Sequence, residues 1–297
     1  MASPLVDAFR NAFFRTIIKT ALVMPYRQRV SWAGRVTATL VAPLSGWRNR
    51  IRINLEHVMP ELPEAERQGI IREVTDNVGR TLIEIYSGRT FLDRIQDIDM
   101  TGPGFEAFQA ARATGRPVVL VTAHLGNYDV VRGKLYRDGH PIAALYKPME
   151  NKAFNAHYVK AISTIAEPVY PTTGQGLARL VRHLRSGGIV GIVADVGSRR
   201  APVLSFFDKP AHTPLSAAEL AVKFDAVMIP VFGIRQADGF SFFVEFADPI
   251  ANTEPAEMMQ RYNDTVETYA RRYPGQWFWL HRRWKGLNTK FAVSEDP

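Results

Sequence analysis

Short apolar runs that alternate with helical segments dominate the sequence from about residue 105 onwards. The runs are residues 117–122 (PVVLVT), 141–146 (PIAALY), 188–193 (GIVGIV) and 226–232 (AVMIPVF). Segments with apolar residues at helical spacing lie between or around them, at residues 127–137, 152–165, 176–185 and 215–224. Nearly continuous apolar strands that are connected by helices form parallel sheets buried on both faces. The sequence therefore predicts an α/β fold with a mainly parallel central sheet flanked by helices.

The two ends of the chain differ from this pattern. The spacing of apolar residues predicts two helices in residues 1–45, with a break near Pro25, and a long helix in residues 64–91. Residues 241–246 (SFFVEF) alternate apolar and polar side chains more clearly, and we expect an antiparallel edge strand there. Residues 253–272 predict a closing helix. The first hundred residues are thus expected to be helical.

The excess of basic residues is concentrated at the N-terminus. Residues 1–52 contain nine Lys or Arg residues and one acid, Asp7, so this segment accounts for the whole formal net charge of +8. Asp7, Asn11, Arg15 and Lys19 recur at a spacing of four, which places them in one polar stripe along an otherwise largely apolar helix. We predict that residues 1–52 are a basic amphipathic helical segment that associates with an anionic membrane surface. Residues 53–297 then form the α/β domain.

Two different roles for this segment stay open. A helix with such a stripe commonly packs on the protein's own core, and basic clusters also bind nucleic acid, although we expect no nucleic-acid partner here. A transmembrane helix requires ~20 mostly apolar residues, and basic residues interrupt both apolar stretches of the segment. We therefore expect peripheral or monotopic association with the membrane, without a spanning helix or a cleaved signal peptide.

The clearest candidate site follows the first apolar run, in residues 122–129 (TAHLGNYD). Ligands of open α/β sheets bind outside the carboxyl ends of the strands, and His124 lies at such an end. Gly126 permits a tight turn, and Asn127 is a favourable N-cap for the next helix. We expect Asp129 to fold back across the turn and accept a hydrogen bond from the imidazole of His124, which would orient the ring. The pattern predicts a general base, His124, with Asp129 as its partner.

The remaining sequence restricts what this base can activate. The chain has no cysteine, residues 122–129 contain no serine, and no G-x-S-x-G motif occurs. An acyl-enzyme therefore has no evident nucleophile, and His124 is expected to activate a substrate hydroxyl for direct attack on an acyl thioester. His124 and Asp129 are too few for a metal site, and we expect neither a metal nor a cofactor. The structural alternative is that His124 satisfies a buried backbone group and Asp129 supplies charge at a helix start.

The His124 loop and five further blocks, in the same order, resemble the lipid A biosynthesis lauroyl/myristoyl acyltransferases, within the lysophospholipid acyltransferase superfamily. The loop matches H-x-G-N-W-E, with Asp129 in place of Glu. The other blocks are residues 54–61 (N-L…P-E), Tyr146-Lys147-Pro148 (Y-R-P), Asp195 (the Asp of D-Q), residues 206–213 (F-F-G-x-P-A-x-T) and residues 274–285 (P-E-Q-W…H-R-R-W-K). The resemblance extends over nearly the whole chain.

This resemblance implies transfer of an acyl chain from acyl carrier protein to a hydroxyl of a lipid A precursor, at the cytoplasmic face of the inner membrane. It implies His124 and Asp129 as the catalytic pair and no cofactor besides the acyl carrier protein co-substrate. The substrate region would contain Gly126, Asn127, Lys147, Lys160, Asp195, Arg282 and Arg283. Guanidinium groups pair well with oxyanions, so the two arginines are expected to meet acidic phosphate or the carrier protein.

The chain departs from the family pattern at several of these positions. Lys147 replaces an Arg and gives up bidentate anion binding. Val196 replaces the Gln after Asp195, and Lys160 is the nearest counterpart of the arginine expected in the following helix. Two alternatives therefore stay open. One is another lipid acceptor, such as a lysophospholipid or a different glycolipid, and the other is a non-catalytic protein that binds anionic membranes.

Overall fold

A seven-stranded sheet forms the centre of the computed structural model, which describes residues 15–286. The strand order is β1-β9-β8-β2-β5-β3-β4. The strands are β1 (Met100–Thr101), β2 (Val118–Thr122), β3 (Ile142–Tyr146), β4 (Val169–Pro171), β5 (Ile189–Val193), β8 (Val227–Arg235) and β9 (Phe242–Phe246). The five strands from β8 to β4 are parallel, whereas β9 runs antiparallel to β8 and carries β1 parallel to itself. The mainly parallel α/β sheet predicted from the sequence is confirmed.

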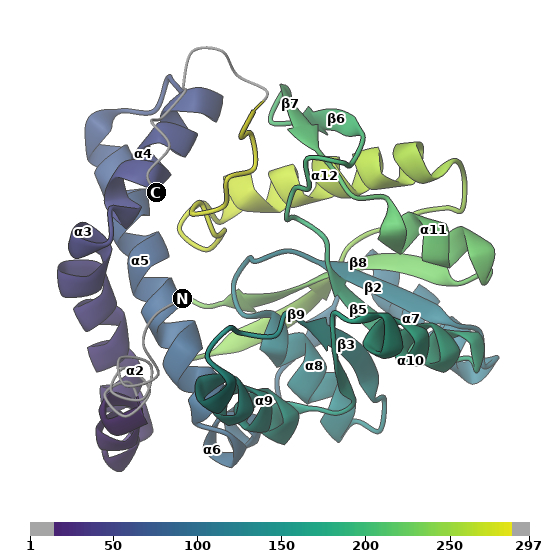
Figure 1. The fold of residues 1–297 in the computed structure, drawn as a ribbon, viewed down its shortest axis with the longest axis horizontal. Coiled ribbons are helices and arrows are strands. Elements are labelled where there is room, and N and C mark those ends of the chain that lie inside the picture. The colour runs from purple at the N-terminus through teal and green to yellow at the C-terminus, as the bar shows by residue number, and fades with distance from the viewer. Residues whose placement is uncertain (1–14, 287–297) are drawn as a thin grey trace.

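Helices cover both faces of this sheet (Figure 1). On one face, side chains pack from α7 (Pro103–Ala113), α8 (Tyr128–Arg137) and α9 (Lys152–Ile165). On the other face, they pack from α10 (Gly174–Arg185), α11 (Ser216–Lys223) and α12 (Pro255–Arg272). Strand β2 serves both cores, because Val118 and Leu120 point to the first and Val119 and Val121 to the second. Burial on both faces explains the continuous apolar run of this strand.

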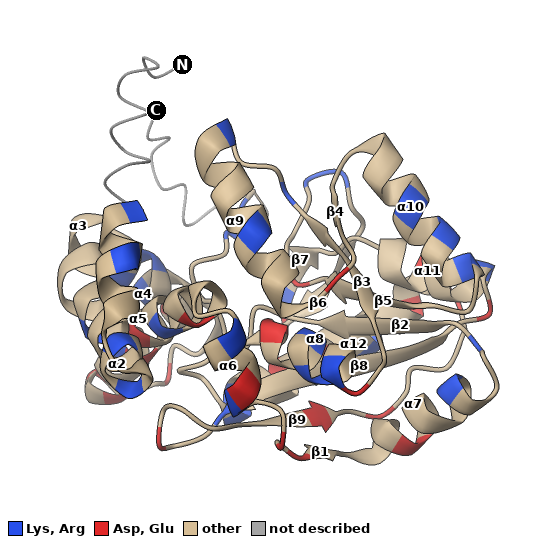
Figure 2. Ribbon diagram, turned by 90° about the horizontal axis from the view of Figure 1, so that it is seen from below, with Lys and Arg blue, Asp and Glu red and all other residues tan. Residues whose placement is uncertain are grey.

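The N-terminal helices form a layer at one side of the sheet (Figure 1). Residues 15–23 are helical, and the helices that follow are α2 (Tyr26–Val36), the π-helix η1 (Thr37–Val41), α3 (Ala42–Leu44), α4 (Trp47–Val58), α5 (Glu64–Tyr86) and α6 (Arg89–Arg94). The predicted break near Pro25 is confirmed. Helix α2 packs closely on α5, since a Cβ at Gly79 would lie 2.4 Å from the carbonyl oxygen of Ala33. Figure 2 marks Lys and Arg along this layer.

Helix α5 connects this layer to both cores. Ile70 and Val74 pack into the core beneath α10–α12, and Ile83 and Ile85 pack into the core beneath α7–α9. Within residues 15–286, no helix combines the length and apolar character needed to span a membrane. The part of the predicted membrane-associating stripe that includes Asp7 and Asn11 lies outside the described residues.

Most predicted elements are present, and the differences have local causes. The antiparallel pairing predicted for residues 241–246 is confirmed in β9, but the predicted edge position is wrong, because the two-residue strand β1 pairs with the outer side of β9. Strands β1 and β4 are two and three residues long, too short to give a period-two pattern. A two-stranded hairpin, β6 (Val203–Phe206) and β7 (Lys209–His212), was also not predicted. It lies outside the main sheet and packs beside α12 (Figure 1).

Candidate active site

His124 and Asp195 lie two residues beyond the carboxyl ends of two adjacent parallel strands. Strand β2 ends at Thr122, strand β5 ends at Val193, and these two residues are paired in the sheet. The ladder continues one step further, since the backbone N–H of Ala194 donates to the carbonyl of Thr122 at 2.9 Å. The sheet register therefore places the two loops side by side at the edge where ligands of parallel sheets bind.

A hydrogen bond joins the two side chains. Nδ1 of His124 lies 2.7 Å from Oδ1 of Asp195. The backbone N–H of His124 and the indole N–H of Trp277 both donate to Oδ2 of Asp195, at 2.9 and 3.0 Å. The Asp195 side chain is 1% exposed, whereas that of His124 is 30% exposed. The carboxylate is thus fixed from three directions, and the engagement of Nδ1 leaves Nε2 of His124 for a substrate.

The electrostatics of the pair favour a protonated imidazole. Burial alone lowers the pKa of His124, but the charge of Asp195 and its hydrogen bond outweigh burial and raise this pKa above the ordinary value. Burial raises the pKa of Asp195, and the opposing charge and hydrogen bond of His124 bring that pKa well below its usual range. Asp195 therefore remains ionised and stabilises the cation that forms when His124 accepts a proton.

A second histidine, His281, shares this carboxylate. Its Nε2 lies 3.7 Å from Oδ2 of Asp195, and the ring centroids of His281 and His124 are 4.5 Å apart in an edge-to-face arrangement. Burial lowers the pKa of His281 to about 4, with only a partial offset from Asp195. His281 is therefore neutral at pH 7. The segment that carries it is tied to the loop, since the N–H of Phe278 donates to the carbonyl of His124 at 2.8 Å.

Asp129 does not make the predicted hydrogen bond to His124. Its carboxylate pairs with Arg132, which also donates to the carbonyl of Ala166 at 2.8 Å. The physical reason is the start of α8 at Tyr128, which places Asp129 inside the helix with Arg132 on the same face at position i+3. The Asp129 side chain is 1% exposed. Burial raises its pKa, and Arg132 opposes that shift.

Gly126 and Asn127 shape the loop, and their backbone N–H groups are not free to bind a substrate. These groups donate to the carbonyls of Gln276 and Gly233, at 3.0 and 2.8 Å. Gly126 has φ +61°, and a Cβ there would lie 2.1 Å from the Gly233 oxygen, so only glycine fits without a shift. The predicted N-cap is confirmed, because the Asn127 side chain accepts from the N–H of Asp129 at 3.0 Å.

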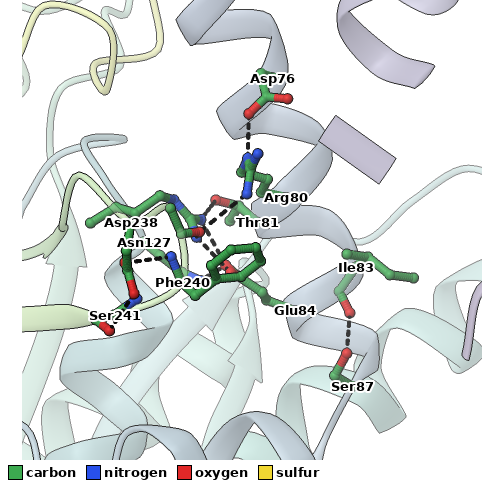
Figure 3. Close-up of polar contacts among 12 residues, drawn as sticks. Asp76, Arg80, Thr81, Ile83, Glu84, Ser87, Asn127, Asp238, Phe240 and Ser241 are labelled. Atoms are coloured by element: carbon green, nitrogen blue, oxygen red, sulfur yellow. Dashed lines mark hydrogen bonds and ion pairs between the residues drawn. The ribbon is translucent and has the colours of Figure 1, made fainter. Parts of the chain in front are cut away.

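A buried ion pair also fixes the position of the loop that carries His124. Glu84 of α5 is fully buried and pairs with Arg235 at the end of β8 through two hydrogen bonds of 2.6 and 2.8 Å. The amide of Asn127 donates to Glu84 at 2.9 Å, and Figure 3 shows it directed at this helix, with Arg80 and Asp76 one and two turns away. The sequence pattern did not predict this cluster. The cluster of Glu84, Arg235 and Asn127 connects the N-terminal helical layer to the His124 loop.

The remaining predicted substrate residues divide into two groups. Arg283 is 2% exposed and donates to the carbonyl of His212, to Thr213 at 2.8 Å and to Asn263 at 3.2 Å. Its predicted contact with phosphate or carrier protein is therefore wrong, because the guanidinium holds the β6–β7 hairpin and α12 together. Lys147, Lys160 and Arg282 are exposed. Lys147 follows β3 at the same sheet edge as His124, and Arg282 is adjacent to His281 in the chain.

Comparison with known protein sequences finds related proteins that match most of the chain. A family model described as bacterial lipid A biosynthesis acyltransferase matches residues 5–286 of the chain. A phosphatidylinositol mannoside acyltransferase of Mycobacterium tuberculosis is 23% identical over 245 residues, which cover 80% of this chain and 78% of that protein. A lipid A biosynthesis acyltransferase of Haemophilus influenzae is 22% identical, with 86% and 81% covered. The lipid A biosynthesis lauroyltransferase of Escherichia coli is 23% identical, with 78% and 77% covered.

Proposed function

Because the chain belongs to the bacterial lipid A biosynthesis acyltransferase family, we propose that it transfers a fatty acyl chain to a lipid hydroxyl with His124 as general base. The observation that supports this role is the 2.7 Å contact between His124 and the buried Asp195 at the carboxyl edge of the sheet. Asp195 replaces Asp129 as the partner that orients the ring. Asp129 is assigned a structural role through Arg132.

The proposed reaction needs no covalent enzyme intermediate. Nε2 of His124 accepts the proton of the acceptor hydroxyl while its oxygen attacks the carbonyl carbon of an acyl thioester. The C–S bond breaks, and the imidazolium returns the proton to the leaving thiolate, so the products are an ester and a free thiol. The charge of Asp195 stabilises the imidazolium between these steps. The absence of cysteine from the chain is consistent with direct attack.

We assign acyl carrier protein as the donor and a lipid A precursor as the acceptor. Support comes from the family description and from relatives named for lipid A biosynthesis. Exposed basic side chains near the site edge, such as Lys147 and Arg282, suit an acidic carrier protein or acceptor phosphates. A phosphatidylinositol mannoside acyltransferase at similar identity supports a second candidate acceptor, another membrane glycolipid.

We place the enzyme on the cytoplasmic face of the inner membrane, with the N-terminal helices against the lipid. Large apolar side chains in this layer face solvent, with Val23 85%, Leu40 58% and Leu44 88% exposed. Exposed basic residues such as Lys19 and Arg50 lie in the same segment. An interfacial membrane anchor combines apolar side chains that enter the acyl region with basic side chains that contact the lipid headgroups.

The deciding experiment measures transfer by the wild type and by His124→Ala, with an acyl carrier protein thioester and a purified lipid A precursor, and identifies the product by mass spectrometry. We expect His124→Ala to lower kcat by about 10²–10⁴, with unchanged circular dichroism. A parallel assay with a mannosylated phosphatidylinositol distinguishes the two acceptors. Full activity of the folded His124→Ala protein would contradict the proposed mechanism.

A further inference from the structure

Three side chains of metal-ligating type converge at the site. His124, Asp195 and His281 each contribute one ligand atom, and these three atoms all lie within 4.8 Å of one another. The two histidines approach different oxygens of the carboxylate: Nδ1 of His124 lies 2.7 Å from Oδ1 of Asp195, and Nε2 of His281 lies 3.7 Å from Oδ2. The three residues come from the loops after β2 and β5 and from the C-terminal segment, so tertiary packing alone assembles them.

The cluster is held in place before any ligand arrives. Asp195 is fixed through Oδ2 by Trp277 and by the backbone of His124, while Oδ1 forms a hydrogen bond with the imidazole of His124. The His281 ring packs against His124 and, at a centroid separation of 4.8 Å, against Phe278. Its Nε2 is buried and has no hydrogen-bond partner within residues 15–286. A buried nitrogen without a hydrogen-bond partner needs an explanation, and next to a carboxylate a bound ion is one such explanation.

The donor set and the spacing fit zinc. Zn²⁺ binds imidazole nitrogen and carboxylate oxygen in tetrahedral geometry, and an open site uses three protein ligands with a fourth position for solvent. Metal–ligand bonds of about 2.0–2.1 Å separate neighbouring ligand atoms by about 3.3 Å. The contacts of 2.7 and 3.7 Å, each to a different oxygen of Asp195, lie on either side of that value, so one ion bound by all three residues requires shifts of the side chains. Two nitrogen ligands disfavour Mg²⁺ and Ca²⁺, which prefer oxygen.

We propose that His124, Asp195 and His281 form a zinc-binding site and that bound zinc inhibits acyl transfer. The inhibition follows from the chemistry of imidazole, because a neutral ring has one lone pair. Coordination through Nδ1 of His124 moves the ring proton to Nε2. The nitrogen that faces the substrate then carries a proton and cannot accept another. Zinc binding stands independently of the reaction, whereas the inhibition rests on the proposed role of His124 as general base.

The test uses full-length, untagged protein that has been stripped with EDTA and desalted. Titration calorimetry with ZnCl₂, and visible absorption after addition of Co²⁺ as a coloured substitute, measure binding without reference to activity. We expect one ion per chain. His281→Ala and Asp195→Asn should each weaken zinc binding by about tenfold or more, since each removes one of three ligands. His281→Gln serves as the second variant if His281→Ala does not fold.

The matched control is His140→Ala. His140 lies at the opposite edge of the sheet, just before β3, where its ring packs on Phe108. This variant should bind zinc like the wild type. Absence of binding, or unchanged affinity in the folded His281 variant, overturns the site.

In the transfer assay, zinc should inhibit and EDTA should restore activity. Binding without inhibition, or activation by zinc, overturns the inhibitory role alone, and failure of the metal-free protein to transfer any acyl chain counts against the proposed function instead.

Discussion

Nδ1 of His124 lies 2.7 Å from Oδ1 of Asp195, although 71 residues separate the two in the chain. The contact arises because both residues follow strands that are neighbours in the sheet, with Thr122 paired to Val193. It differs from the pairing suggested by the five-residue spacing of His124 and Asp129. The orientation of the base therefore depends on the sheet register. The start of α8 instead places Asp129 beside Arg132.

Asp195→Asn should lower kcat by about 10²–10⁴. An amide at this position no longer stabilises the imidazolium, and its NH₂ group can favour the wrong tautomer of His124. Steady-state acyl transfer measures the effect. Asp225→Asn is the matched control, because that side chain is 82% exposed in a surface pair with Arg116. If the folded Asp195→Asn protein keeps wild-type kcat, Asp195 does not orient the base.

Asp129→Asn should lower stability more than it lowers the activity of the folded protein. The substitution leaves Arg132, whose side chain is 10% exposed, without its charged partner. Breaking a buried ion pair from one side costs about 3–5 kcal/mol. Urea unfolding measures this loss, and kcat per folded molecule should stay within a few-fold of the wild type. A stable Asp129→Asn protein with a kcat as low as that of Asp195→Asn would restore the assignment made from the sequence.

The sequence was sufficient to predict the parallel strands β2, β3, β5 and β8 and the position of His124, because a strand buried on both faces gives a continuous apolar run, and the run of β2 ends visibly at Thr122. It was not sufficient to pair His124 with Asp195. That pairing requires the spatial order β2-β5-β3, in which β5 lies between strands that are consecutive in the apolar pattern. Asp195 was identified only as a substrate residue by resemblance.

Two further features of the site differ in how far the sequence could reveal them. The pairing of Asp129 with Arg132 was accessible as an i, i+3 pair inside the helix capped by Asn127. Trp277 and His281 belong to a segment without helix or strand. No periodicity marks such a segment, so only tertiary packing places its side chains against Asp195.

The pH profile of transfer should have an acidic limb above the ordinary histidine value of 6.5, because the pKa of His124 is raised by Asp195. The base must be neutral, so kcat/KM is lost as the pH falls through this raised pKa. In Asp195→Asn only the effect of burial remains, which lowers the pKa, and the limb of the residual activity should move to lower pH. The measurements need EDTA in every buffer. A limb at the same pH in both proteins would exclude His124 as the titrating base.

Gly126→Ala should cost several kcal/mol of stability and reduce kcat, whereas Gly115→Ala should cost only about 1 kcal/mol. Both glycines have positive φ, at +61° and +71°. A Cβ at Gly126 would lie 2.1 Å from the Gly233 oxygen, while nothing lies within 4 Å of a Cβ at Gly115. The difference in unfolding free energy between the two variants thus isolates the close approach of the His124 loop to β8. Equal losses would show that the backbone angle alone sets the effect.

Replacing exposed apolar side chains of the N-terminal layer should weaken membrane binding. In Val23→Ser/Leu44→Ser, two side chains that are 85% and 88% exposed lose their apolar groups. We expect the affinity of this double variant for vesicles that contain an anionic phospholipid to fall by about tenfold or more. Each removed methylene or methyl group contributes up to about 0.8 kcal/mol of transfer free energy when it is buried. Co-sedimentation with the vesicles measures the loss.

The matched control for this surface is Leu177→Ser/Val203→Ser, which changes two side chains that are each 48% exposed on α10 and β6. Helix α10 also carries a row of basic residues (Figure 2), so the comparison tests the location of the binding face and not merely the presence of charge. The control should bind vesicles like the wild type. Higher salt should weaken vesicle binding by both the control and the wild type. Part of the attraction is electrostatic, and such attraction is screened over about 10 Å at 0.1 M salt. Equal losses in the two double variants would move the membrane face away from the N-terminal helices, and binding that salt does not change would argue against the electrostatic part of the attraction.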